Sequence, residues 1–138
     1  MTGPTAHHIL VITDDSGTGG QLQLGFTRSA PQCRVGVVRS RQEIQTEQAP
    51  YLILLDLMLS GESPFEVLRW LRAEPRFAHV PVFVLGSKVV NHEIDEAYAL
   101  GANSCLLKES ELNGFEKIVR AIAAYVGLIT TPGCECIA

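Results

Sequence analysis

Five short runs of apolar residues, each the length of a buried strand, constrain the fold more than any other feature of this chain. Their apolarity is continuous rather than alternating, which is typical of strands covered on both faces. Segments with helical signals lie between them, and each crossover between parallel strands needs such a covering element. The pattern therefore predicts an α/β domain with a parallel sheet between two helical layers. The runs occupy residues 9–12, 35–38, 51–55, 82–85 and 105–107.

The intervening segments carry start and stop signals of helices. Residues 63–66 combine a capping serine, a proline at the first helical position and a glutamate at the third, and they predict a helix that runs to about Ala73. Residues 40–43 repeat the capping pattern and predict a short second helix. Apolar spacing predicts three more helices, which are expected over residues 20–29, from Asn91 to a stop at Gly101, and behind a cap at Asn113.

Composition and charge narrow the class of protein. A chain of 138 residues, 46% of them hydrophobic, has room for one well-buried core, and we expect one domain over residues 7–126 with a tail over residues 127–138. The net charge of −4 and the scattered basic residues argue against nucleic-acid binding. No apolar run approaches the roughly 20 residues that span a bilayer, and the first residues do not resemble a signal peptide. We therefore expect a cytoplasmic protein without a membrane partner.

Three carboxylates and one amine directly follow predicted strands. Asp14 and Asp15 follow the first strand, Asp56 the third and Lys108 the fifth. Ligand sites of open parallel sheets lie beyond the carboxyl ends of the strands, so these groups should converge. Carboxylates gathered in this way repel one another unless a cation intervenes, and the cluster predicts a Mg²⁺ site. The alternative is that these acids are only loop residues or helix caps.

Asp56 is the candidate nucleophile of this cluster. It ends the most apolar run, which we expect to be the most central strand. A carboxylate at such a site can form an aspartyl phosphate while a metal ion and a lysine, here Lys108, neutralise charge on the transferring group.

At these positions the chain resembles the receiver domains of two-component response regulators, from Ile9 to about Ala124. Residues 52–59, with Gly61 and residues 65–68, resemble the phosphorylation-site segment of that family. The segments 81–85 and 101–108 are similar to its fourth strand and to its fifth strand with the lysine. The spacing of residues 81–107 and the single-domain length most resemble the receivers that partner bacterial phytochromes.

The resemblance implies a flavodoxin-like, doubly wound (βα)5 fold with a five-stranded parallel sheet in the order 2-1-3-4-5. It implies Asp56 as the phosphoacceptor and Lys108 as the phosphate contact. Mg²⁺ would be held by Asp14, with Asp15 adjacent, by Asp56 and by the backbone carbonyl of Met58. The implied partner is a sensor histidine kinase, with a phytochrome as the expected type. Such a chain is a signalling module and not an enzyme.

Several positions depart from the family pattern near the acids. Thr13 stands where the family usually has the first acid of its acid pair, and Ser60 stands where a proline often follows the phosphorylation site. Glu109 replaces the proline that usually follows the lysine, so we expect a trans bond between Lys108 and Glu109, since a cis bond without proline costs about 2.5–4 kcal/mol.

The switch positions also differ. Gly86 stands at the place of the switch hydroxyl, and Ser87, one residue later, would point to the opposite face of a strand. Ser87 can substitute for the hydroxyl only if the loop turns. Cys105 replaces the aromatic switch residue.

Three functions are compatible with the sequence. The leading one is a phosphorylation-controlled binding module that receives its phosphoryl group from a kinase. The second is a degenerate receiver that binds partners without phosphorylation, which Thr13, Gly86 and Cys105 favour. The third is a flavodoxin-like FMN electron carrier, because residues 13–18 form a hydroxyl- and glycine-bearing loop at the place of a flavin phosphate. The two acids in that loop oppose phosphate binding.

The end of the chain predicts a homodimer. Residues 127–132 are apolar and β-branched, which is unusual for a free tail, and the amphipathic last helix could form a self-complementary patch. The alternative is that this stretch folds back on its own subunit.

Overall fold

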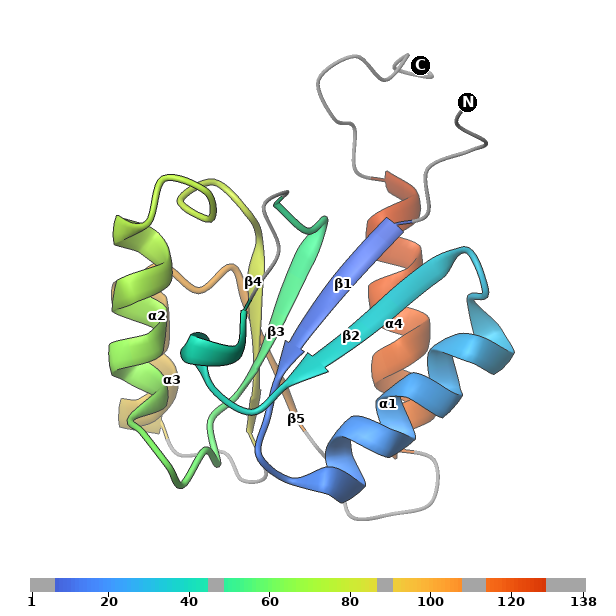
Figure 1. Ribbon diagram of the computed structural model, residues 1–138, viewed down its shortest axis with the longest axis horizontal. Helices are drawn as coiled ribbons and strands as arrows, with labels where there is room; N and C mark the ends of the chain where they lie inside the picture. The colour runs from blue at the N-terminus through green and yellow to red at the C-terminus, as the bar shows by residue number, and fades with distance from the viewer. Residues whose placement is uncertain (1–6, 45–48, 87–90, 108–113, 129–138) are drawn as a thin grey trace.

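The computed structural model describes residues 7–44, 49–86, 91–107 and 114–128, and the following statements concern these residues. Strands and helices alternate along the chain as the apolar runs predict (Figure 1). The five strands form one parallel sheet in the order β2-β1-β3-β4-β5, which confirms the predicted flavodoxin-like fold. The elements are β1 (His7–Ile12), α1 (Ser16–Ser29), β2 (Cys33–Val38), the 3₁₀ turn η1 (Arg41–Glu43), β3 (Leu52–Asp56), α2 (Pro64–Ala73), β4 (Val82–Gly86), α3 (Asn91–Ala99), β5 (Ser104–Leu107) and α4 (Gly114–Leu128).

Two hydrophobic cores lie on opposite faces of the sheet. Helices α1 and α4 cover one face, and α2 and α3 cover the other (Figure 1). Along β3, Leu52 and Leu54 belong to the first core, whereas Ile53 and Leu55 belong to the second, as the two-residue period of a strand requires. Every residue of β3 is buried, and β3 is the middle strand, which confirms the expectation that Asp56 ends the most central strand.

The first two helices differ from expectation. Helix α1 begins at Ser16 rather than at residue 20, because the carboxylate of Asp15 caps it by accepting hydrogen bonds from the Gly17 amide (3.2 Å) and the Thr18 hydroxyl (2.6 Å). The short helix predicted at residues 40–43 was wrong: the segment forms only η1. The side chain of Ser40 makes no capping hydrogen bond, and Glu43 instead accepts from the backbone amide of Arg39 (2.8 Å).

The other helix predictions are confirmed where they fall on described residues. Helix α2 ends at Ala73, and the hydroxyl of Ser63 accepts a hydrogen bond from the Glu66 amide (3.4 Å). Helix α3 begins at Asn91, and Gly101 follows it with φ +106°, a left-handed conformation that favours glycine. The predicted cap at Asn113 lies outside the described residues.

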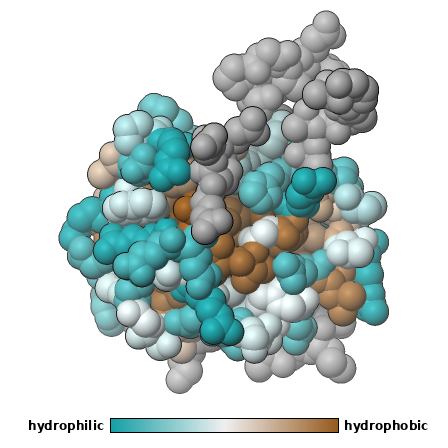
Figure 2. Space-filling model, in the orientation of Figure 1, coloured by the Kyte–Doolittle hydropathy of each residue, from teal (hydrophilic) through white to brown (hydrophobic). Residues whose placement is uncertain are grey.

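The surface is mixed in polarity. In Figure 2 apolar side chains occupy the middle of the view, between hydrophilic surfaces on either side. The edge strand β2 contributes half-buried apolar residues, among them Val35 and Val37. Within the described residues no helix has the length and apolarity needed to cross a membrane.

Candidate functional site

The carboxylate of Asp56 is buried at the carboxyl end of β3. Its side chain is 0% exposed. The hydroxyl of Thr13 donates a hydrogen bond to Oδ2 (2.7 Å), and the amide of Met58 donates to Oδ1 (2.9 Å). Asp56 has further interactions beyond these two. The hydrogen bonds satisfy a buried carboxylate and fix its orientation at the edge where the site was predicted.

Thr13 is the residue whose role sequence reasoning missed. It follows the last residue of β1, is 2% exposed, and its hydroxyl also accepts a hydrogen bond from the Asp15 amide (3.1 Å). Strands β1 and β3 pair in parallel with Ile12 opposite Leu55, so the residues that follow each of them come together. That register is the signal that could have revealed the contact between Thr13 and Asp56.

Asp14 is held by the turn that follows β3. Its Oδ2 atom accepts hydrogen bonds from the amide of Ser60 (2.9 Å), the hydroxyl of Ser60 (3.0 Å) and the amide of Gly61 (3.1 Å). The Ser60 amide is the largest cause that lowers the pKa of Asp14, while burial acts in the opposite direction and the Gly61 amide and Ser60 hydroxyl add to the lowering. Asp14 is therefore held as a carboxylate.

Asp15, predicted to adjoin the metal site, is the exposed N-cap of α1. Its two oxygens accept hydrogen bonds from Gly17 and Thr18. A flavin phosphate on this loop would compete with the Asp15 carboxylate for the Gly17 amide and the Thr18 hydroxyl, and it would meet a negative charge. The arrangement argues against the flavodoxin-like electron carrier.

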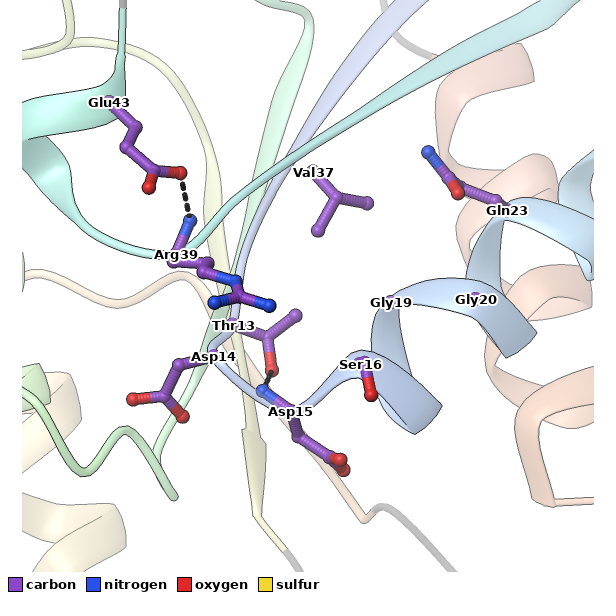
Figure 3. A pocket seen from close by; sticks show the side chains of 10 residues that line it. All are labelled: Thr13, Asp14, Asp15, Ser16, Gly19, Gly20, Gln23, Val37, Arg39 and Glu43. Atoms are coloured by element: carbon purple, nitrogen blue, oxygen red, sulfur yellow. Dashed lines mark hydrogen bonds between the residues drawn. The ribbon is translucent and has the colours of Figure 1, made fainter.

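A cavity of about 490 Å³ lies beside these acids, between the first turns of α1 and the end of β2. Gly19 lies close to Val37 at the bottom of the cavity, and a Cβ at this glycine would lie 3.0 Å from a Val37 methyl carbon. Arg39 comes from the segment after β2 and lines the cavity together with Thr13 (Figure 3). The cavity is lined by Thr13, Asp14, Asp15, Ser16, Gly19, Gly20, Gln23, Val37, Arg39 and Glu43.

The oxygen chemistry of the site fits a hard divalent cation, but with few charges. Asp14 and Asp56 supply two carboxylates. The backbone of Met58 lies next to Asp56, since the Met58 amide donates a hydrogen bond to that carboxylate. The third nearby side chain is the neutral hydroxyl of Thr13. Within the described part of the chain, no group of three or more His, Cys, Asp or Glu side chains is arranged to hold a metal ion.

The remaining predicted site residues are described only in part. Lys108 and Ser87 lie outside the described residues. Gly86 ends β4 and pairs with Leu107, so no side chain projects from this switch position. Cys105 is half-buried on β5, where burial raises the pKa of its thiol and a hydrogen bond with Tyr98 opposes that effect.

Comparison with known proteins assigns the family. The sequence model of the response regulator receiver domain matches residues 9–120. The chain belongs to this receiver family. Transcriptional regulatory protein AfsQ1 of Streptomyces coelicolor is 32% identical over 119 residues, which are 83% of this chain and 50% of that protein. Response regulator Rcp1 of Synechocystis is 30% identical over 88 residues, which are 64% of this chain and 60% of Rcp1.

Solved receiver structures agree with this assignment. The Mn²⁺-bound form of Rcp1 superimposes with a TM-score of 0.78 at 26% identity, covering 91% of this chain and 99% of that one. The phosphorylated cyanobacterial phytochrome response regulator RcpA gives a TM-score of 0.79 at 27% identity, covering 91% and 96%. The resemblance to phytochrome-associated receivers is thus confirmed. Receiver domains act generally in signalling rather than as enzymes.

Proposed function

We propose that this receiver accepts a phosphoryl group from a sensor histidine kinase on Asp56. The observation that carries the proposal is the placement of Asp56 at the end of the central strand β3, at the carboxyl edge that it shares with Asp14. The likeness to a phosphorylated receiver, RcpA, supports it. A kinase of the phytochrome type and a cytoplasmic location belong to the same proposal.

In this reaction one oxygen of Asp56 forms a bond to phosphorus, and the bond from phosphorus to the kinase histidine breaks. The amide of Met58 and the hydroxyl of Thr13 keep the carboxylate oriented through its two oxygens. We assign Lys108 to contact the phosphoryl group and Ser87 as the nearest substitute for the missing switch hydroxyl.

Mg²⁺ belongs to the proposal as the cofactor. When bound, it would neutralise charge on the transferring group. Asp14, Asp56 and the carbonyl of Met58 would hold it, with Asp15 remaining the cap of α1 beside it. The likeness to a Mn²⁺-bound receiver supports a divalent cation.

The test is intact-mass measurement after incubation with acetyl phosphate and Mg²⁺. We expect a phosphate-sized mass gain that is lost in Asp56→Asn and kept in Asp15→Asn, which neutralises the neighbouring cap acid as a matched control. A gain that persists in Asp56→Asn would overturn the assignment of the acceptor.

A phosphorylation-independent interaction module is the second candidate. The full burial of Asp56 under the Thr13 hydroxyl favours it, as do the absent side chain at Gly86 and the thiol at Cys105. Kinase binding that is equal for the wild type and Asp56→Asn, without any mass gain, would establish this alternative.

A further inference from the structure

Two hydroxyl-bearing residues hold the two site acids in place. Thr13 donates to Oδ2 of Asp56 (2.7 Å), and Ser60 donates to Oδ2 of Asp14 through both its hydroxyl (3.0 Å) and its amide (2.9 Å). Both are positions at which the sequence departs from the family pattern, with an acid usual at one and a proline often at the other. We call these two contacts, with the Gly61 amide, the hydroxyl latch.

The hydroxyl latch occupies one oxygen of each site acid, Oδ2 of Asp14 and Oδ2 of Asp56, through which the acids can also bind a divalent cation. A carboxylate oxygen has two lone-pair directions, and three donors already approach Oδ2 of Asp14. Mg²⁺ demands near-ideal octahedral geometry at about 2.0–2.1 Å, so a ligand oxygen must turn toward the ion and away from competing donors. A cation that takes Oδ2 of Asp14 therefore has to displace donors of the latch, and so does a cation that approaches Oδ2 of Asp56 from the side of the Thr13 hydroxyl.

The charges around Thr13 are mixed in sign. Thr13 supplies a neutral hydroxyl at the edge that bears Asp14 and Asp56, and Arg39 lines the same cavity as Thr13 (Figure 3). The hydrogen bond of Arg39 to Glu43 is made by its backbone amide and not by its guanidinium. The same cavity is also lined by Asp14, Asp15 and Glu43, so its net charge is negative and favours a cation. The competition with a cation therefore comes from the hydrogen bonds of the latch and not from the charge of Arg39.

The geometry points to Thr13 and Ser60 as residues that set the metal affinity of this receiver: their hydrogen bonds compete with a divalent cation for Asp56 and Asp14. Cation binding then frees the turn at Ser60 and Gly61 from β1, so occupancy of the site is coupled to the loop after β3. This inference rests on the proposed function only for the location of the metal site.

The test is a titration with Mn²⁺ in the absence of any phosphodonor, in which isothermal titration calorimetry measures the dissociation constant. Thr13→Val and Ser60→Ala remove the hydroxyls and add no charge. We expect each variant to tighten Mn²⁺ binding by about 2- to 10-fold, which corresponds to the loss of one net hydrogen bond, and the double variant to tighten it further. The effect of Ser60→Ala should be the smaller one, because the Ser60 and Gly61 amides still donate to Asp14. Thr27→Val is the matched control, because the Thr27 hydroxyl donates to the Gln23 carbonyl on the exposed side of α1 (2.8 Å) and bonds neither site acid.

Unchanged or weaker Mn²⁺ binding in a folded double variant would overturn the inference, since the hydroxyls would then be neutral or would themselves help to hold the ion. If the double variant does not fold, amide exchange in the wild type decides the question. Saturating Mg²⁺ should speed exchange at Ser60 and Gly61, and continued protection of both amides would contradict the latch. Neither measurement involves phosphoryl transfer, so failure of Asp56 to accept phosphate leaves the result intact.

Discussion

At the scale of single residues, Arg72 shows how one side chain connects loops that are distant in sequence. From α2, its guanidinium donates hydrogen bonds to four backbone carbonyls and to the side chain of Asn103 (2.9 Å). Asn103 in turn accepts from the Val82 amide at the start of β4 (2.9 Å). Burial lowers the pKa of Arg72. The four carbonyls belong to Phe77, Ala78, Val80 and Gly101, at 2.8–3.2 Å.

We expect Arg72→Lys to lower the free energy of unfolding by about 2–3 kcal/mol, because an ammonium group cannot reach these acceptors together and leaves half-buried carbonyls unpaired. Urea denaturation measures the change. Arg69→Lys on the same helix is the control: the Arg69 side chain is 59% exposed and pairs with the exposed Glu66, so its change should stay within about 0.5 kcal/mol. Equal effects of both substitutions would show that the Arg72 contacts do not stabilise the loops.

At the scale of elements, Gly25 weakens the helical pattern of α1 in the sequence but serves the packing of α1 in the structure. A glycine inside a helix costs up to about 1 kcal/mol relative to alanine, so the sequence reads it as an interruption. In the structure α1 packs on α4, and a Cβ at Gly25 would lie 2.8 Å from a methyl carbon of the fully buried Val119. The glycine permits the close approach of the two helices.

Gly25→Ala should therefore destabilise the protein by about 1 kcal/mol despite its better helix propensity, because overpacking of a stiff valine outweighs the gain. Gly20→Ala in the same helix meets no atom within 4 Å and should instead stabilise by up to about 1 kcal/mol. Thermal unfolding compares the two. In a double-mutant cycle, Val119→Ala should relieve the effect of Gly25→Ala, with a coupling of about 0.5–3 kcal/mol. Stabilisation by both glycine substitutions would refute the contact.

At the scale of the whole molecule, the edge strand β5 leaves apolar surface in contact with water. Its four residues are at most half-buried, and Leu107 is 45% exposed. Tyr98 of the neighbouring helix α3 is 48% exposed. A homodimer would bury this apolar surface together with the apolar residues 127–132.

We expect the full-length chain to be a homodimer, and a variant that ends at Leu128 to be a monomer. The cut is placed there because α4 continues to Leu128, so the helix is preserved. Light scattering after size exclusion gives the molar mass. Leu24→Glu on α1, where Leu24 is 51% exposed, is a control that should leave the dimer intact. A full-length chain that is monomeric at high micromolar concentration would rule out the dimer.

Local patterns in the sequence were sufficient for the α/β class, the bounds of α2 and the family. Continuous apolar runs report burial on both faces, and the cap at Ser63 reports a helix start, because each depends on residues close together in the chain. The segment at residues 40–43 shows the limit of such patterns: a capping motif without an apolar face behind it yields only the turn η1.

Only the tertiary structure decided how the site acids are held. The contact of Thr13 with Asp56 spans 43 residues, and that of Asp14 with Ser60 spans 46. Such pairs depend on the register of β1 against β3 and on the path of the turn after β3, which no local pattern reports. The sequence by itself thus determined that Asp14 and Asp56 follow strands that end at the carboxyl edge of the sheet. The fold decided which groups bond to these acids, because hydrogen bonds form between groups that packing brings within about 3 Å.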